Sequence, residues 1–216
     1  MKVLVTSGAT REPIDSVRYI SNLSSGRTGA AICEALAARG SRVTQLHGVD
    51  SVRAAGIARH EVFTDHASLD ELLGRMLTDG RYDAVIHAAA VGDFAVSGPL
   101  SGTKLPSGGE LALRLRPTAK IIDHIRSHAG GQELTLIGFK LTHHPDPAAQ
   151  VRAATDLMAR SGADYIVQND VATLDDAEHV FIIHARGGGQ WRCSGREALA
   201  MALVTLLEQL PSRSPA

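Results

Sequence analysis

The sequence predicts an α/β fold: a doubly wound, mostly parallel, Rossmann-like sheet with helices on both faces. Apolar strand patterns alternate with amphipathic helix patterns through the first 90 residues. One of these strands, residues 84–90, is a run of apolar residues around His87, as is typical of a strand buried on both faces of a parallel sheet. Right-handed crossovers between such strands place helices on the two faces of the sheet.

The first half of the chain supplies this alternation element by element. In chain order we expect a strand at 3–6, a helix at 29–38, strands at 42–46 and 60–63, a helix at 68–77 and a strand at 84–90. Ser68 and Glu71 match a capping box for the second helix, and Gly80 follows its last turn. Stretch 94–109 is rich in Gly, Ser and Pro, which indicates a mobile flap.

The second half continues with shorter signals. The expected elements begin with a strand at 111–116, a helix capped by Thr118, a strand at 134–139, and a helix opened by Asp146-Pro147 and ended by Gly162. A strand at 165–167 follows, and Asn169-Asp170 after it are read as a turn. The last elements are a hairpin at 180–184 and 191–193 and a helix capped by Ser194 with Glu197. Leucines alternate with other residues in 111–116, so this small strand is expected outside the main sheet. We expect one domain over 1–210 and a disordered tail at 211–216.

Composition excludes several classes of function. The formal net charge is −1, which argues against a general nucleic-acid surface. No apolar run approaches the ~18 residues of a membrane span, and the first apolar run is too short for a signal peptide, so a cytoplasmic protein is expected. Cys33 falls in an apolar helical pattern and is expected to be a buried thiol, although one disulfide with Cys193 remains open.

The loop after the first strand is the most informative candidate site. Ligands of doubly wound sheets bind beyond the carboxyl ends of the strands, and this loop holds about twenty residues where an ordinary one needs ~2–6. Ser24, Ser25 and Gly26 precede the helix, where hydroxyls and backbone N–H groups together could hold a phosphate. The loop also carries Arg11 and Arg18. The alternative is an elaborate turn in which these arginines bond to Glu12 and Asp15.

Three further segments, after Ala90, Gly138 and Val167, end at the same edge. Asp93, after the alanines at 88–90, could accept bonds from a nucleotide or hold Mg²⁺, or could cap a turn. Lys104 in the flap could close on a developing negative charge, or be merely solvated. Phe139 could pack on a base or fill the core, and Lys140 could reach a phosphate.

Other common sites have no sequence signature. The ten histidines show no spacing with Cys, Asp or Glu that suggests a zinc site, so no metal-ligating residues are assigned. The glycines do not form the dinucleotide pattern G-x-G-x-x-G. None of the three tyrosines is followed four residues later by a lysine, which counts against an NAD(P)-dependent reductase of the short-chain type.

Residues 8–29, GATREPIDSVRYISNLSSGRTG, resemble the signature of phosphopantothenate–cysteine ligases. Further matching segments are AAAVGDF, TKLPSGGELAL, PTAKII, IGFK and ADYIVQNDV, so the resemblance runs from about residue 3 to 171. It implies a ligase that joins cysteine to 4′-phosphopantothenate in coenzyme A biosynthesis. The acid would first be activated as an acyl-nucleotidylate, with CTP favoured over ATP and with Mg²⁺ on the nucleotide.

The resemblance also implies roles for individual residues. Asn22 would bind and position the acyl-nucleotidylate, Arg18 would serve the second half-reaction, and Lys104 would support formation of the intermediate. Together with the loop chemistry, it gives the expected nucleotide-binding residues: Gly8, Ser24, Ser25, Gly26, Ala89, Asp93, Lys104, Ala119, Lys120, Ile121, Ile122 and Phe139.

Some implications concern partners and departures from the family pattern. No flavin is expected, because no part of the chain could be the decarboxylase domain of fused forms; a separate decarboxylase of the pathway is a possible partner. A homodimer using strand 111–116 is implied. Lysines of the family's later helix are replaced by Leu157 and Ser161, which leaves the choice of base open. A nucleotide-binding paralogue without turnover is the main alternative to the enzyme.

Overall fold

A computed structural model of the chain describes residues 1–57, 59–97, 103–106, 108–174 and 179–210. The expected disordered tail, 211–216, lies outside the described residues, as do positions 98–102 and 107 of the expected flap. Within the described part, no helix is both long and apolar enough to cross a membrane.

The core of the molecule is one eight-stranded sheet, and the predicted doubly wound, mostly parallel arrangement is confirmed. Its strands run in the spatial order β12 (Gln190–Ser194), β11 (Val180–Ala185), β10 (Tyr165–Asp170), β9 (Thr135–Thr142), β6 (Ala84–His87), β1 (Lys2–Ser7), β4 (Arg42–Gly48) and β5 (Arg59–Phe63). Strands β5 through β10 in this order are mutually parallel, and the β11–β12 hairpin is antiparallel. The order of connection reverses between β1 and β6, so this is the switch point of the doubly wound fold.

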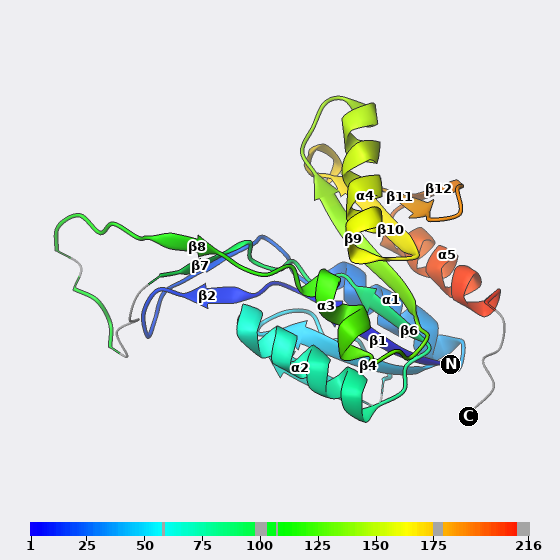
Figure 1. Ribbon diagram of the computed structural model, residues 1–216, viewed down its shortest axis with the longest axis horizontal. Coiled ribbons are helices and arrows are strands. Elements are labelled where there is room, and N and C mark those ends of the chain that lie inside the picture. The colour runs from blue at the N-terminus through cyan, green and yellow to red at the C-terminus, as the bar shows by residue number, and fades with distance from the viewer. Residues whose placement is uncertain (58, 98–102, 107, 175–178, 211–216) are drawn as a thin grey trace.

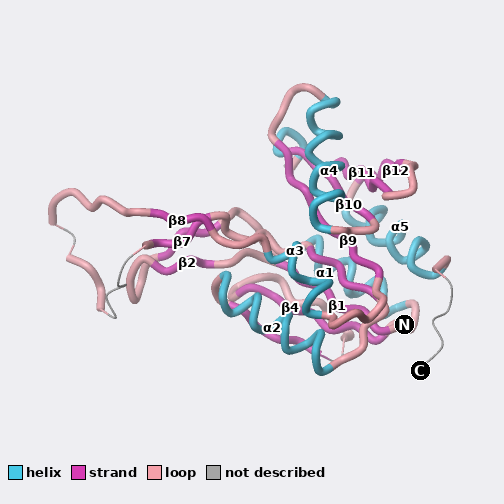
Figure 2. Tube along the Cα trace, viewed as in Figure 1, coloured by secondary structure: helices cyan, strands magenta, loops and turns pink. Residues whose placement is uncertain are grey.

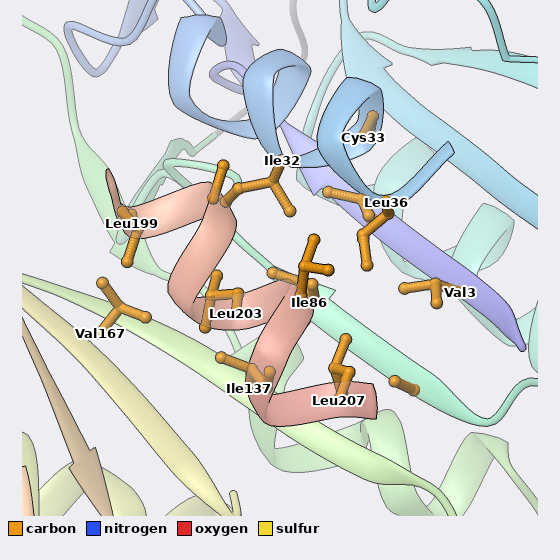
Figure 3. Close-up of a cluster of buried hydrophobic side chains, with 14 of the residues drawn as sticks. Val3, Ile32, Cys33, Leu36, Ile86, Ile137, Val167, Leu199, Leu203 and Leu207 are labelled. Atoms are coloured by element: carbon orange, nitrogen blue, oxygen red, sulfur yellow. The ribbon is translucent and has the colours of Figure 1, made fainter. Parts of the chain in front are cut away.

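Helices cover both faces of the sheet. Helices α1 (Arg27–Ala38) and α5 (Arg196–Glu208) pack together on one face, and α2 (His66–Asp79), α3 (Ile121–His128) and α4 (Pro147–Ser161) lie on the other (Figures 1 and 2). In Figure 3, leucines of α5 face Ile32 and Leu36 of α1 above the apolar strands. Cys33 lies fully buried in this cluster, as predicted, and both cysteines are free thiols.

Local sequence chemistry explains the ends of α4. Asp146 accepts hydrogen bonds from the N–H groups of Ala148 and Ala149, at 2.9 and 3.2 Å, and Pro147 occupies the first helical position. Gly162 ends the helix with a φ of 69°, a conformation that favours glycine. Both predicted ends are therefore confirmed.

The capping box predicted for α2 is wrong by three positions. The N-cap is Asp65, whose carboxylate accepts from the N–H of Ser68 at 2.8 Å while the Ser68 hydroxyl accepts from the N–H of Asp65 at 3.0 Å. Ser68 is thus the third residue of the helix rather than its cap. Asp65 and Ser68 bond to each other's backbone N–H groups, so the capping box starts three residues upstream of the predicted one.

Two other predicted caps are also wrong. Helix α3 begins after Lys120 with no side-chain cap, and the Thr118 hydroxyl instead donates to the carbonyl of Gly92 at 2.7 Å. Helix α5 begins after Gly195, again with no side-chain cap, because Ser194 is the last residue of β12. In both cases a longer-range pairing uses the residue that the local pattern assigned to the helix.

Strand lengths differ from prediction where ligands are expected. Strand β6 ends at His87, and only Ala90 of the remaining predicted strand forms a bridge, to Ala9. Strand β10 runs on to Asp170, so the turn predicted at Asn169-Asp170 is wrong. Pairing with β9, which extends to Thr142, holds these polar residues in the sheet.

A pair of hairpins forms an arm that projects from the body (Figure 1). Strands β2 (Arg11–Pro13) and β3 (Tyr19–Ser21) pair with each other, and β7 (Phe94–Val96) pairs with β8 (Leu115–Pro117). The strand predicted at 111–116 is therefore reduced to its last residues plus Pro117, although its place outside the main sheet is confirmed.

Candidate functional site at the switch point of the sheet

The loops after β1 and β6 stay paired beyond the edge of the sheet. Ala9 and Ala90 form a parallel bridge, the N–H of Ala90 donates to the carbonyl of Gly8 at 2.7 Å, and the N–H of Thr10 donates to the carbonyl of Ala90 at 3.2 Å. The Thr10 hydroxyl accepts from the N–H of Gly92 at 2.8 Å. The two loops therefore form one rigid wall at the switch point, where ligands of this fold bind.

Glycines bring the start of α1 onto this wall. A Cβ on Gly8 (φ 82°) would lie 1.9 Å from the Ser51 hydroxyl oxygen, and one on Gly26 (φ 76°) would lie 3.0 Å from the Ser51 Cβ. Only glycine fits at either position. Ser24 is half-buried and Ser25 is exposed beside them. The first amides of α1, which have no partner within the helix, lie in the same segment as these hydroxyls, as an anion site requires.

Asn22 joins the first loop to the second. Its side-chain N–H donates to the carbonyl of Val91 at 2.9 Å, while the neighbouring Ser21 hydroxyl donates to the carbonyl of Thr10 at 2.8 Å. Asn22 is nevertheless exposed to solvent. The amide is thus held in position at the switch point by a backbone contact 69 residues away, with its face open to a ligand.

Arg11 of the hairpin β2–β3 already has partners within the chain. Arg11 forms an ion pair with Asp50, at 2.8 Å, and its guanidinium lies 4.4 Å from the centre of the Tyr19 ring. The Glu12 carboxylate accepts from the N–H of His66 at 2.9 Å. The predicted alternative, in which loop arginines bond to Glu12 and Asp15, is therefore wrong for Arg11 and Glu12, whereas Arg18 does bond to Asp15.

Arg18 and Asp15 fasten the flap. The Asp15 side chain is fully buried and accepts from the Arg18 Nε at 2.8 Å and from the N–H of Leu105 at 3.0 Å. Arg18 also donates to the Leu105 carbonyl at 2.9 Å. The hydrogen bonds from Arg18 hold the pKa of the Asp15 carboxyl well below its usual range. The exposed Lys104 precedes Leu105, so this link places the flap lysine beside the turn of the β2–β3 hairpin.

The second loop is tied to the segment before α3. Asp93 is mostly exposed and forms an ion pair with Lys120. The Ala119 carbonyl bonds to the His66 Nε2 at 2.7 Å. A pocket of about 320 Å³ lies beside these residues, lined by Glu12, Pro13, Asp65, His66, Ala67, Ala95, Val96, Arg116, Pro117, Thr118 and Ala119.

Three of the predicted nucleotide contacts have their side chains turned inward. Ile121 and Ile122 are buried among the residues under α2 and α3, and Phe139 packs against the core cluster beneath α1 and α5. The isoleucines can therefore meet a ligand only through the free backbone N–H groups at the start of α3. Ala89 is half-buried, and its N–H donates to the Thr6 hydroxyl at 3.2 Å.

Polar residues at the ends of β9 and β10 form hydrogen bonds that hold the strands together. The Asp170 carboxylate accepts from the Thr142 hydroxyl at 2.6 Å, and that bond is the main cause of its lowered pKa. Asn169 bonds to His179 at 3.1 Å. These residues are bound to the sheet itself, whereas Asn22 contacts the loop after β6 and Arg18 contacts Leu105 of the flap.

His87 is a buried titratable group beneath the site that the sequence did not indicate. Its Nδ1 lies 2.9 Å from the Thr6 hydroxyl oxygen, and burial lowers its pKa to about 4. The ring is therefore neutral at neutral pH. Ser51 was also missed, because it contacts the distant Gly8 and Gly26. Asp15 was expected to bond to a loop arginine, but its bond to Leu105 of the flap was missed.

Comparison with known proteins agrees with this geometry. The family model described as the DNA/pantothenate metabolism flavoprotein C-terminal domain matches residues 1–210. The chain is 38% identical over 185 residues to the coenzyme A biosynthesis bifunctional protein CoaBC of Thermococcus kodakarensis, covering 86% of this chain and 45% of that protein. It is 32% identical to the protein of the same name from Methanocaldococcus jannaschii, covering 84% and 44%. The chain thus spans about half the length of these relatives.

Solved structures show the same fold. The crystal structure of the DNA/pantothenate metabolism flavoprotein from Streptococcus pneumoniae matches with a TM-score of 0.85 and 27% identity, covering 96% of this chain and 98% of that one. The C-terminal domain of a CoaBC protein matches with a TM-score of 0.77 and covers 96% and 93%, and at 22% identity this likeness concerns the fold alone.

Proposed function

The chain belongs to the family of the DNA/pantothenate metabolism flavoprotein C-terminal domain, and we propose that it is a phosphopantothenate–cysteine ligase of coenzyme A biosynthesis. The observation that carries this proposal is the position of Asn22. The signature loop folds so that this amide lies at the switch point, bonded to the loop after β6 and open to solvent.

The proposed reaction has two steps. In the first, the carboxylate of 4′-phosphopantothenate attacks the α-phosphorus of the nucleotide, a P–O bond forms, and pyrophosphate leaves. In the second, the amine of cysteine attacks the acyl carbon of the acyl-nucleotidylate. The amide bond forms, the nucleoside monophosphate leaves with the C–O electron pair, and the amine loses a proton.

The residues of the site suit these steps. The Asn22 amide can donate a hydrogen bond to the acyl carbonyl of the intermediate without competing as a nucleophile. Lys104 on the fastened flap would add positive charge where pyrophosphate departs. The Arg18 guanidinium donates hydrogen bonds to the Asp15 carboxylate and the Leu105 carbonyl. We therefore propose that Arg18 serves the second step by holding the flap over the intermediate.

We propose that the nucleotide binds along the wall formed by the loops after β1 and β6, between the starts of α1 and α3. The phosphates would meet the amides and hydroxyls at 24–26, while Ala89, Asp93 and the segment 119–122 would border the nucleoside. CTP is proposed as the nucleotide, on the family resemblance, with ATP as the alternative. Free amides at the starts of two helices suit an anionic ligand.

We propose that Mg²⁺ enters the site bound to the nucleotide phosphates rather than to protein carboxylates. The carboxylates at the site already have partners: Asp93 pairs with Lys120, and Glu12 accepts from the N–H of His66. Mg²⁺ commonly keeps several waters and binds through substrate phosphates. It would neutralise the triphosphate, while the protein holds the chain of phosphates in place.

We also propose that the protein acts as a homodimer through the projecting arm. Large apolar side chains on the arm are exposed: Phe94, Leu111, Leu113 and Leu115. Exposed leucines gathered on one projection are typical of an interface.

Product formation tests the ligase directly. Purified protein with Mg²⁺, 4′-phosphopantothenate, cysteine and either CTP or ATP should form phosphopantothenoylcysteine, detected by mass spectrometry, with CTP the better substrate. Asn22→Ala should lower the rate by about 10²–10³-fold, the usual effect of removing one preorganised donor. Leu23→Ala changes a fully exposed neighbour in the same loop and should leave the rate unchanged. Binding of nucleotide by folded protein without any product would instead identify a paralogue without turnover.

A further inference from the structure

Three possible metal ligands meet between α2 and α3, away from the wall of the proposed active site. They are Asp70 of α2 and His124 and His128 of α3, and one ligand atom of each lies within 4.8 Å of the other two. The His128 Nε2 lies 3.0 Å from an Asp70 carboxylate oxygen, and the two imidazole rings stand edge to face with centres 6.3 Å apart.

The fold itself produces this cluster. His124 and His128 are four residues apart, so they lie on one face of α3, while Ile121, Ile122 and Ile125 point into the core. The ring of His128 lies against Gly74 of α2, where an added Cβ would come 3.3 Å from its Nδ1. A glycine inside a helix has a stability cost, and here it leaves room for the ring.

We propose that Asp70, His124 and His128 form a binding site for a divalent transition metal, with Zn²⁺ as its best fit. Two imidazoles and one carboxylate are a common ligand set for zinc and leave a fourth position for water. Zinc bonds of ~2.0–2.2 Å place tetrahedral ligand atoms about 3.3 Å apart. The Asp70 and His128 ligand atoms lie 3.0 Å apart, close to this spacing, and the His124 ligand atom lies within 4.8 Å of both.

The site is placed to stiffen the segment that carries the proposed nucleotide contacts. Helix α3 begins directly after Lys120, and His66 at the start of α2 already bonds to the Ala119 carbonyl. A metal at the cluster would cross-link the same two helices at a second point. The helices would then hold the start of α3 at a fixed distance from α2, whether or not the protein is a ligase.

Zinc binding to untagged, metal-free protein tests the proposal. Calorimetric titration with Zn²⁺ should give one equivalent, and His124→Ala should weaken binding at least tenfold. His124 is chosen because its imidazole makes only a ring contact in the cluster. Zinc at a hundredfold excess over its Kd should raise Tm by roughly 5–10 °C. The bond of His128 to Asp70 makes Asp70→Asn a second, independent variant.

His143→Ala is the matched control, because His143 is an exposed histidine outside the cluster. It should bind zinc as the parent does. The proposal is overturned if His124→Ala and Asp70→Asn bind zinc like the parent, if His143→Ala alone loses it, or if the folded parent binds none. Each readout is independent of catalysis, so failure of the ligase assay does not affect it.

Discussion

Gly29 is the residue whose substitution tests most sharply how α1 is positioned at the site. It is the third residue of α1, and a Cβ added there would lie 2.4 Å from the Ser7 Cβ and 3.4 Å from the Ser7 Cα. Alanine favours a helix over glycine by about 0.5–1 kcal/mol. Overpacking of this kind costs about 1–3 kcal/mol. The cost of overpacking therefore exceeds the gain in helix propensity, and Gly29→Ala should lower the free energy of unfolding by about 1–2 kcal/mol.

Urea unfolding and thermal melting measure this loss. For a chain of this size, Tm should fall by roughly 2–8 °C. Gly74→Ala is the matched control within a helix, because its Cβ would meet only the His128 ring, at 3.3 Å, and a side chain can move where a strand cannot. Ser7→Gly removes the clashing Cβ, so a double-mutant cycle should show a favourable coupling of about 1 kcal/mol. A Gly29→Ala protein as stable as the parent, or zero coupling, would refute the reasoning.

Two further predictions concern buried titratable groups, the His87 imidazole and the Asp15 carboxylate. The pKa of His87 is about 4 in the folded chain against 6.5 for an unperturbed histidine, so the unfolded state binds the proton first as pH falls. The free energy of unfolding should therefore fall between pH 6.5 and 4, by about 2 kcal/mol at pH 5. Urea titrations at several pH values should show a smaller fall for His87→Gln. An equal fall in both proteins would contradict the lowered pKa of His87. Asp15→Asn removes the carboxylate that accepts from Arg18 and Leu105, so hydrogen exchange of the Leu105 amide should accelerate and ligation should slow. Unchanged exchange at Leu105 would show that the flap is held by other contacts.

The sheet and the helix faces could be predicted from sequence because their signals are local. Apolar runs and helical periodicity act within ten or so residues, and α4 is bounded by Asp146, Pro147 and Gly162 in the expected places. The caps of α2, α3 and α5 were misplaced because a competing partner decided each one. Asp65 precedes Ser68 at α2, and Thr118 bonds to Gly92 rather than to α3.

The arm and the supporting residues of the site depend on distant contacts. Strands β2, β3, β7 and β8 have three residues each, too few for a recognisable alternation, and β7 pairs with β8 across the flap. Asn22 could be singled out by resemblance, but its bond to Val91 could not. The metal cluster had one local signal, the four-residue spacing of His124 and His128; its third member, Asp70, lies on another helix.

Pyrophosphate release tests the central claim most directly. Folded protein with Mg²⁺ and CTP should release pyrophosphate only when 4′-phosphopantothenate is present, because its carboxylate is the proposed nucleophile. Cysteine should raise the rate by clearing the acyl-nucleotidylate, and ATP in place of CTP should be less effective. Release that does not depend on 4′-phosphopantothenate, or no release with either nucleotide, would contradict the account.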